Sequence, residues 1–126
     1  MSYTTTTDMI LLVEQDVVAR GTISQLLRES GYDVVEAADG TEALECLKNC
    51  RFDLVITDLV LPKVNGLKLV DNIRETWPNL PVIVVSGYLA EDIGKFLLCG
   101  SAQFFQTPIK RDVLIETVRS LISRPR

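Results

Sequence analysis

The stretch that decides the fold runs from residue 52 to residue 66 and reads Phe52-Asp-Leu-Val-Ile-Thr-Asp58-Leu-Val-Leu-Pro62-Lys-Val-Asn-Gly66. Its first half is a short apolar run, typical of a buried strand, and its second half holds the proline and glycine of a turn. In open α/β sheets, chemistry takes place just beyond the carboxyl ends of the strands. The stretch therefore predicts a buried strand over residues 53–57 that ends in a functional carboxylate, Asp58.

Three other short runs are also followed directly by polar or turn residues. These runs and the residues that follow them are 9–13 with Glu14, Gln15 and Asp16, 81–85 with Ser86 and Gly87, and 102–106 with Thr107 and Pro108. The carboxyl ends of parallel strands meet at one edge of a sheet. We therefore expect these side chains to frame one small polar pocket around Asp58.

Amphipathic segments alternate with the apolar runs along the whole chain. The expected strands are 9–13, 33–37, 53–57, 81–85 and 102–106, and the expected helices are 17–30, 40–49, 67–76, 90–99 and 111–123. Gly31 and Trp77-Pro78 are stop signals for the first and third helices, and Gly94 weakens the fourth by about 1 kcal/mol relative to alanine. This alternation predicts a doubly wound α/β fold of the flavodoxin-like class, with a five-stranded parallel sheet in the order 2-1-3-4-5.

Composition limits the classes of protein that fit. A chain of 126 residues with 47% hydrophobic and 24% charged residues is typical of one globular domain. The net charge of -4 argues against a nucleic-acid surface. The sequence has no apolar run of membrane-spanning length and no secretory signal, so we expect a cytoplasmic protein that does not enter the membrane. Residues 1–8 are expected to form a disordered leader, 9–123 the domain and 124–126 a tail.

The sequence contains three cysteines and no histidine. This count argues against both a disulfide framework and a Cys/His zinc site. Cys46 and Cys50 are one helical turn apart, and we expect them to face the core or its boundary.

Four segments, in this order and spacing, resemble the receiver domain of two-component response regulators, and the resemblance covers residues 8–123. The segments are Ile10-Leu-Leu-Val-Glu14-Gln-Asp16, Asp53-Leu-Val-Ile-Thr-Asp58-Leu-Val-Leu-Pro62 with Gly66, Val84-Val-Ser86-Gly87, and Gly100 through Thr107-Pro108. The resemblance implies that Asp58 accepts a phosphoryl group from a sensor histidine kinase or a phosphotransfer protein. It also implies that Ser86 contacts this group and that Phe104 is an aromatic switch position.

The resemblance further implies a magnesium site formed by Glu14, Gln15, Asp58 and the backbone carbonyl of Val60. A carboxylate attacks phosphorus only when charge on the transferring group is neutralised, which normally requires magnesium and a cationic side chain. The family has a second acid where this chain has Gln15. An amide oxygen can coordinate magnesium but brings no charge, so we expect weak binding.

The second departure from the family is Thr107, which replaces a lysine. A cation about 4 Å from the phosphoryl group is worth on the order of 4 kcal/mol before desolvation is subtracted, and Thr107 cannot supply it. Lys63 and Lys110 are candidates for a substitute cation, and Asp16 is a candidate for a substitute acid. None of the three occupies the family's position.

Two functions remain open at this point. The first is a phosphorylated signalling switch whose output partner binds through the fourth helix, fifth strand and fifth helix. The second is a pseudo-receiver, which binds partners without phosphoryl input. In both cases the domain is not an enzyme, except that a phosphoacceptor catalyses at most its own phosphorylation and dephosphorylation. A flavin-binding protein is disfavoured because Glu14, Gln15 and Asp16 stand where a phosphate loop is needed.

Overall fold

Five parallel strands form one sheet in the order β2-β1-β3-β4-β5, which confirms the predicted topology. The computed structural model describes residues 7–58, 66–86, 102–106 and 109–122. The strands are β1 (Met9–Val13), β2 (Asp33–Ala37), β3 (Leu54–Asp58), β4 (Val82–Ser86) and β5 (Ala102–Gln106).

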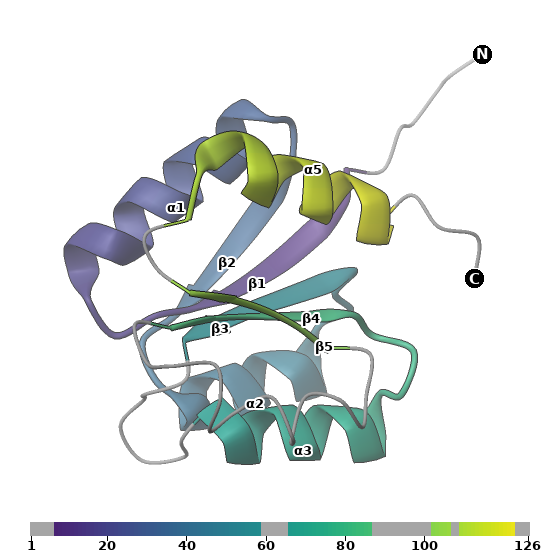
Figure 1. Cartoon of the computed structure of the whole chain (residues 1–126). Coiled ribbons are helices and arrows are strands. Elements are labelled where there is room, and N and C mark those ends of the chain that lie inside the picture. The colour runs from purple at the N-terminus through teal and green to yellow at the C-terminus, as the bar shows by residue number, and fades with distance from the viewer. Residues whose placement is uncertain (1–6, 59–65, 87–101, 107–108, 123–126) are drawn as a thin grey trace.

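Helices cover both faces of the sheet. They are α1 (Val17–Glu29), α2 (Gly40–Asn49), α3 (Gly66–Thr76) and α5 (Arg111–Ile122). Figure 1 shows α1 and α5 together over one face and α2 and α3 over the other. The helix expected over residues 90–99 lies outside the described residues. No described helix is long and apolar enough to cross a membrane.

The sheet separates two apolar cores, and β1 contributes to both. Ile10 and Leu12 pack with α1 and α5 residues, whereas Leu11 and Val13 pack with α2 and α3 residues. All four side chains are at most 1% exposed. Successive strand residues point to opposite faces, and both faces are covered, so a continuous apolar run is required here.

Local backbone chemistry ends α1 where the sequence predicts. Gly31 has φ of 98°, a left-handed conformation that favours glycine. Its N–H donates to the Arg28 carbonyl at 3.0 Å, and the Tyr32 N–H donates to the Leu27 carbonyl at 3.1 Å. This pair of bonds is a Schellman motif, which satisfies carbonyls at the helix end and turns the chain toward β2.

Two strands, β3 and β4, begin one residue later than predicted. Just before β3, the Asp53 carboxylate accepts from the Met9 N–H at 2.8 Å, and the Asp53 N–H donates to the Met9 carbonyl. Just before β4, Pro81 has no N–H to donate to a ladder. Its carbonyl still accepts from the Val55 N–H at 3.0 Å. The shift places Asp58 and Ser86 inside their strands as last residues.

The cysteines near the end of α2 differ in exposure. Cys46 is partly buried and packs against the core under α2 and α3, as expected, and burial raises the pKa of its thiol. Cys50 is exposed, so the expectation of a core or boundary position is wrong for this residue. Cys50 caps the helix with an extended backbone, which carries its side chain off the buried face.

Candidate functional site

The register of the central strands brings Glu14 and Asp58 together. Val13 of β1 is paired with Thr57 of β3, so the next residue of each strand, Glu14 and Asp58, lies at the same edge. On the other side of β3, Asp58 is paired with Val85 of β4. The chain order reverses between β1 and β3, and such a switch point is where open α/β sheets bind ligands.

The Glu14 and Asp58 carboxyl groups are in direct electrostatic contact. Burial raises the pKa of Glu14, and the charge of Asp58, a hydrogen bond between the two side chains and the charge of Asp16 raise it further. The Asp16 N–H, which donates to Glu14 Oε2 at 3.0 Å, opposes these effects. Two carboxylates this close favour either a shared proton or a bound cation.

The carboxylate of Asp16, the candidate for the acid that Gln15 lacks, is hydrogen-bonded at the start of α1. Its Oδ1 accepts from the Val18 N–H at 3.1 Å, so the carboxylate caps the amino end of α1. This use follows from the preference of aspartate for the N-cap position. The Gln15 side chain is exposed.

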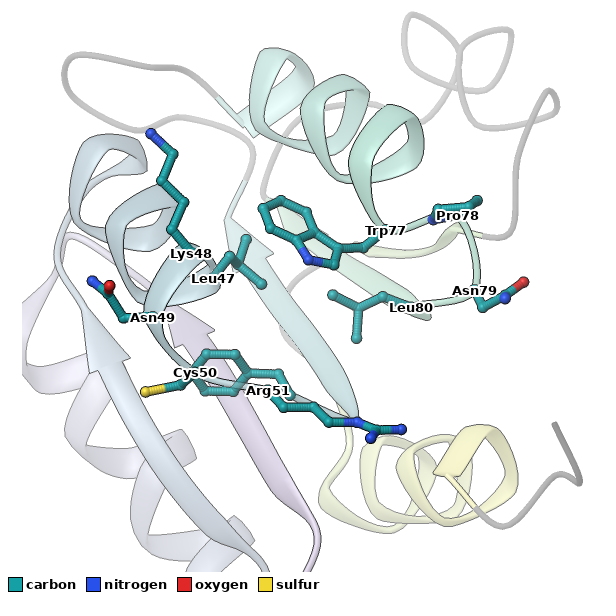
Figure 2. Close-up of a pocket in the computed structure, with 10 residues that line it drawn as sticks. Leu47, Lys48, Asn49, Cys50, Arg51, Trp77, Pro78, Asn79 and Leu80 are labelled. Atoms are coloured by element: carbon teal, nitrogen blue, oxygen red, sulfur yellow. The ribbon is translucent and has the colours of Figure 1, made fainter.

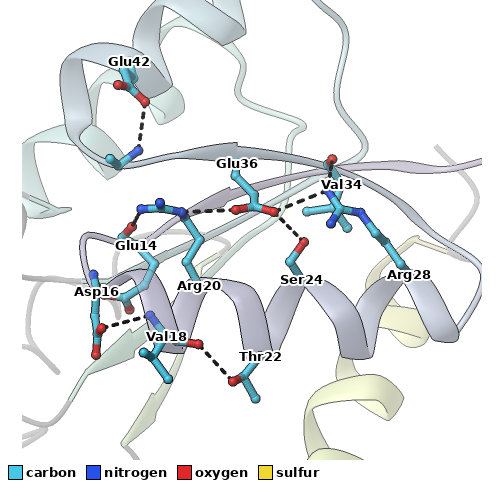
Figure 3. A network of polar contacts seen from close by, with 11 residues as sticks. Glu14, Asp16, Val18, Arg20, Thr22, Ser24, Arg28, Val34, Glu36 and Glu42 are labelled. Atoms are coloured by element: carbon cyan, nitrogen blue, oxygen red, sulfur yellow. Dashed lines mark hydrogen bonds and ion pairs between the residues drawn. The ribbon is translucent and has the colours of Figure 1, made fainter.

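An arginine on α1 holds the turn that carries Glu14. The Arg20 Nη1 donates to the Glu14 backbone carbonyl at 2.8 Å, and its Nε donates to Glu36 Oε1 of β2 at 3.1 Å. The Glu14 N–H donates to the Ala37 carbonyl at 3.0 Å. Figure 3 shows the arginine between the turn and the Glu36 carboxylate. The turn after β1 is therefore fixed to both β2 and α1.

Glu36 is itself held from α1 by further donors. Ser24 Oγ donates to its Oε2 at 2.9 Å, and the Arg28 Nη2 lies 3.4 Å from the same oxygen (Figure 3). The Ser24 hydroxyl, followed by the two guanidinium groups, lowers the pKa of Glu36 against an opposing effect of burial. Sequence reasoning missed this network. The sequence does contain one indication of this network. Glu36 lies on the same strand face as the buried Val34, and a charged residue on a covered face is expected to pair with a polar group of the covering helix.

The structure describes the remaining predicted site residues to different extents. Val60, Lys63 and Thr107 lie in the undescribed segments, and for Ser86 only the backbone is described, as the last residue of β4. Phe104 of β5 is half-buried and packs against the core under α2 and α3. Its packing role is thus shown, and its switching role stays a prediction.

The described residues offer oxygen donors for a cation at this edge. Glu14 and Asp58 supply two carboxylates, the number that magnesium commonly takes from a protein, and Gln15 adds an amide oxygen on the same turn. The described residues contain no group of three or more acidic, cysteine or histidine side chains placed to hold a metal. The mutual repulsion of Glu14 and Asp58 is what a bound cation would relieve, so the donor set fits magnesium.

Comparison with known proteins decides the family. The family model described as the response regulator receiver domain matches residues 10–119. The chain belongs to this family. The receiver domain is thus a module of two-component signalling, and the match lends no support to the flavin-binding alternative.

Curated relatives of this receiver domain are longer proteins. It is 38% identical over 102 residues to the Regulator of RpoS of Escherichia coli (strain K12), covering 80% of this chain and 30% of that protein. It is 31% identical over 117 residues to the response regulator MprA of Mycobacterium sp. (strain KMS), covering 91% and 50%. It is 33% identical to the CAI-1 autoinducer sensor kinase/phosphatase CqsS of Vibrio cholerae, covering 90% and 17%. The chain thus matches half or less of each of these proteins.

Solved structures agree on the fold. The CheY-like response regulator receiver domain protein from Methanospirillum hungatei JF-1 matches with a TM-score of 0.88 at 27% identity, covering 93% of this chain and 94% of that one. The receiver domain of the Francisella response regulator 1452 matches with a TM-score of 0.87 at 28% identity, covering 94% and 99%. The five-stranded receiver fold is therefore shown by topology and by likeness.

Proposed function

We propose that this receiver domain accepts a phosphoryl group on Asp58 from a histidine kinase or a phosphotransfer protein and then changes its affinity for an output partner. The observation that carries the proposal is the strand register that places Glu14 and Asp58 side by side at the carboxyl ends of β1 and β3, where Asp58 raises the pKa of Glu14. An acidic pair at the switch point of an open sheet suits a cation and an anionic phosphoryl group.

The transfer itself is a displacement at phosphorus. A carboxylate oxygen of Asp58 forms the new P–O bond while the bond from phosphorus to the donor nitrogen breaks, and the donor imidazole takes up the electron pair. Magnesium, when bound by Glu14, Asp58, Gln15 and the Val60 carbonyl, supplies the charge neutralisation that this displacement requires. Because Gln15 is neutral, we propose that this binding is weak.

The chain's own residues orient the acidic pair. Glu14 is fixed through its backbone by Arg20 and through its carboxylate by the Asp16 N–H. On β3, the buried Thr57 Oγ1 donates to the Asp58 carbonyl at 2.8 Å, which fixes the backbone where the chain leaves the strand. A nucleophile held by rigid elements loses little orientational freedom on reaction.

The proposal extends to partners and location. A sensor histidine kinase or phosphotransfer protein is the donor, and the output partner binds at β5, α5 and the helix expected over residues 90–99. The domain acts in the cytoplasm as a signalling module, and its catalysis is limited to its own phosphorylation and dephosphorylation. Since Thr107 replaces the family's lysine, we expect a small difference in partner binding between the two states.

Intact-mass measurement after incubation with acetyl phosphate and magnesium tests this proposal. The unaltered protein and an Asp71→Asn variant, which removes an exposed acid of α3, should each gain the mass of one phosphoryl group. Asp58→Asn should gain none, and removal of magnesium should abolish the gain. A folded, unaltered protein that gains no mass from acetyl phosphate or from any histidine phosphodonor would support the pseudo-receiver alternative instead.

A further inference from the structure

A hollow of about 580 Å³ lies at the edge of the sheet opposite Asp58. One wall is the end of α2 and the segment that leads into β3, and the other is the turn between α3 and β4. The described residues that line it are Leu47, Lys48, Asn49, Cys50, Arg51, Phe52, Trp77, Pro78, Asn79 and Leu80. Figure 2 shows the two walls facing each other, with Leu47 on one side and the Trp77 and Leu80 side chains on the other.

Buried side chains and backbone hydrogen bonds of the fold hold both walls in place. Leu47 and Phe52 are 4% and 6% exposed, and Trp77 and Leu80 pack partly buried against the same core. In the turn, the Trp77 N–H donates to the Ile73 carbonyl at 2.7 Å and the Leu80 N–H donates to the Trp77 carbonyl at 3.0 Å. The hollow is therefore preformed, as small-molecule sites usually are.

The charge of the lining is opposite to the charge of the protein. Among the described lining residues, Lys48 and Arg51 are cationic and none is acidic, although the chain carries a net charge of -4. Neither cation forms a hydrogen bond or an ion pair with another described side chain. Arg51 thus offers a fork of donors beside apolar walls, which suits a carboxylate in two-pronged geometry.

We propose that this hollow binds a small organic anion with a flat apolar body and one carboxylate. The indole of Trp77 and the ring of Phe52 contact the body, and Arg51 binds the carboxylate. The volume lies within the range of small-ligand sites, about 300–1,000 Å³. The proposal does not depend on phosphorylation, because Glu14 and Asp58 lie at the other edge of the sheet.

The chain offers a direct reporter, since Trp77 is its single tryptophan. The probe is 3-phenylpropionate, and its neutral amide, 3-phenylpropionamide, is the matched control ligand. Binding should shift Trp77 emission saturably and should move the backbone amide signals of residues 47–52 and 77–80 in a ¹⁵N-labelled sample. The amide should bind about fivefold more weakly or worse, because it lacks the charge that Arg51 recognises.

Variants separate the charge from the shape of the site. Arg51→Gln should weaken the binding of 3-phenylpropionate about fivefold but leave the affinity for the amide unchanged. Arg51→Lys should recover part of the lost affinity. Arg119→Gln, which removes an exposed cation of α5, should change the affinity for neither ligand. The proposal is overturned if 3-phenylpropionate gives no saturable change in either signal, if the amide binds equally well, or if Arg51→Gln has no effect.

Discussion

Replacement of Arg20 tests the network that holds the turn beside the acidic pair. Arg20→Met keeps the apolar stem of the side chain and removes two hydrogen bonds. The bond to Glu36 joins side chains that are 18% and 31% exposed, so after solvent screening it contributes about 1 kcal/mol. The bond to the Glu14 carbonyl is 2.8 Å long and partly buried, and it contributes about 1 kcal/mol more. We expect a loss of about 2 kcal/mol, or roughly 6 to 8 °C in Tm for a domain of this size.

Urea unfolding at pH 7 and at successively lower pH measures this loss. The pKa of Glu36 is lowered in the folded protein. Its contribution is thus complete above the pKa of the unfolded glutamate and disappears as the pH falls through the folded pKa. The difference between Arg20→Met and the unaltered protein should therefore shrink to about 1 kcal/mol in acid, the share of the Glu14 carbonyl bond. If Arg20→Met destabilises no more than Arg119→Met at pH 7, the network does not hold the turn.

Substitutions of Glu14, of two glycines at α1 and of Gln15 give three further predictions. Glu14→Gln should raise the free energy of unfolding at pH 7 without magnesium, because the pKa of Glu14 is raised in the folded protein and its ionised form is therefore unfavourable there. The gain should vanish below the pKa of unfolded glutamate, and equal urea midpoints at pH 7 would contradict this. Gly21→Ala inside α1 should stabilise the protein by about 1 kcal/mol, whereas Gly31→Ala, at φ of 98°, should destabilise it by about 1 kcal/mol. A Tm that changes in the same direction for both variants would refute the helix-end assignment. Gln15→Asp should tighten the binding of magnesium about fivefold in a calorimetric titration, since it restores one negative charge. Unchanged affinity would show that charge at this position does not limit magnesium binding.

The main features of the fold could be predicted from the sequence because strand-like and helix-like patterns of apolar residues alternate regularly along it. Apolar runs of strand length alternate with amphipathic segments, and only a parallel sheet covered on both faces buries both. The placement of Glu14 and Asp58 at one edge could also be predicted, because the carboxyl ends of parallel strands meet at the same edge of the sheet. The first residues of β3 and β4 were predicted one position too early. An apolar run predicts that a strand exists but not its first paired residue, which depends on the register with the neighbouring strand.

The electrostatics of the site could not be predicted in the same way. The pKa of Glu14 depends on burial and on its distance from Asp58, and both arise only when β1 and β3 pair. Arg20 and Glu36 are 16 residues apart in sequence and meet through tertiary packing. The position of Asp16 in the sequence makes it a candidate ligand. In the structure its carboxylate caps α1, a local hydrogen bond that the pairing of strands does not predict.

Chemical trapping of the phosphorylated residue is the most direct test of the proposed role of Asp58. The protein is treated with acetyl phosphate and magnesium and then with sodium borohydride, which reduces an acyl phosphate to an alcohol, and the peptides are sequenced by mass spectrometry. We predict homoserine at position 58 and unmodified residues at positions 14 and 16. A reduced product at Glu14 or Asp16, or an unmodified Asp58 in a protein that has gained a phosphoryl group, would contradict the assignment of Asp58 as the phosphoacceptor.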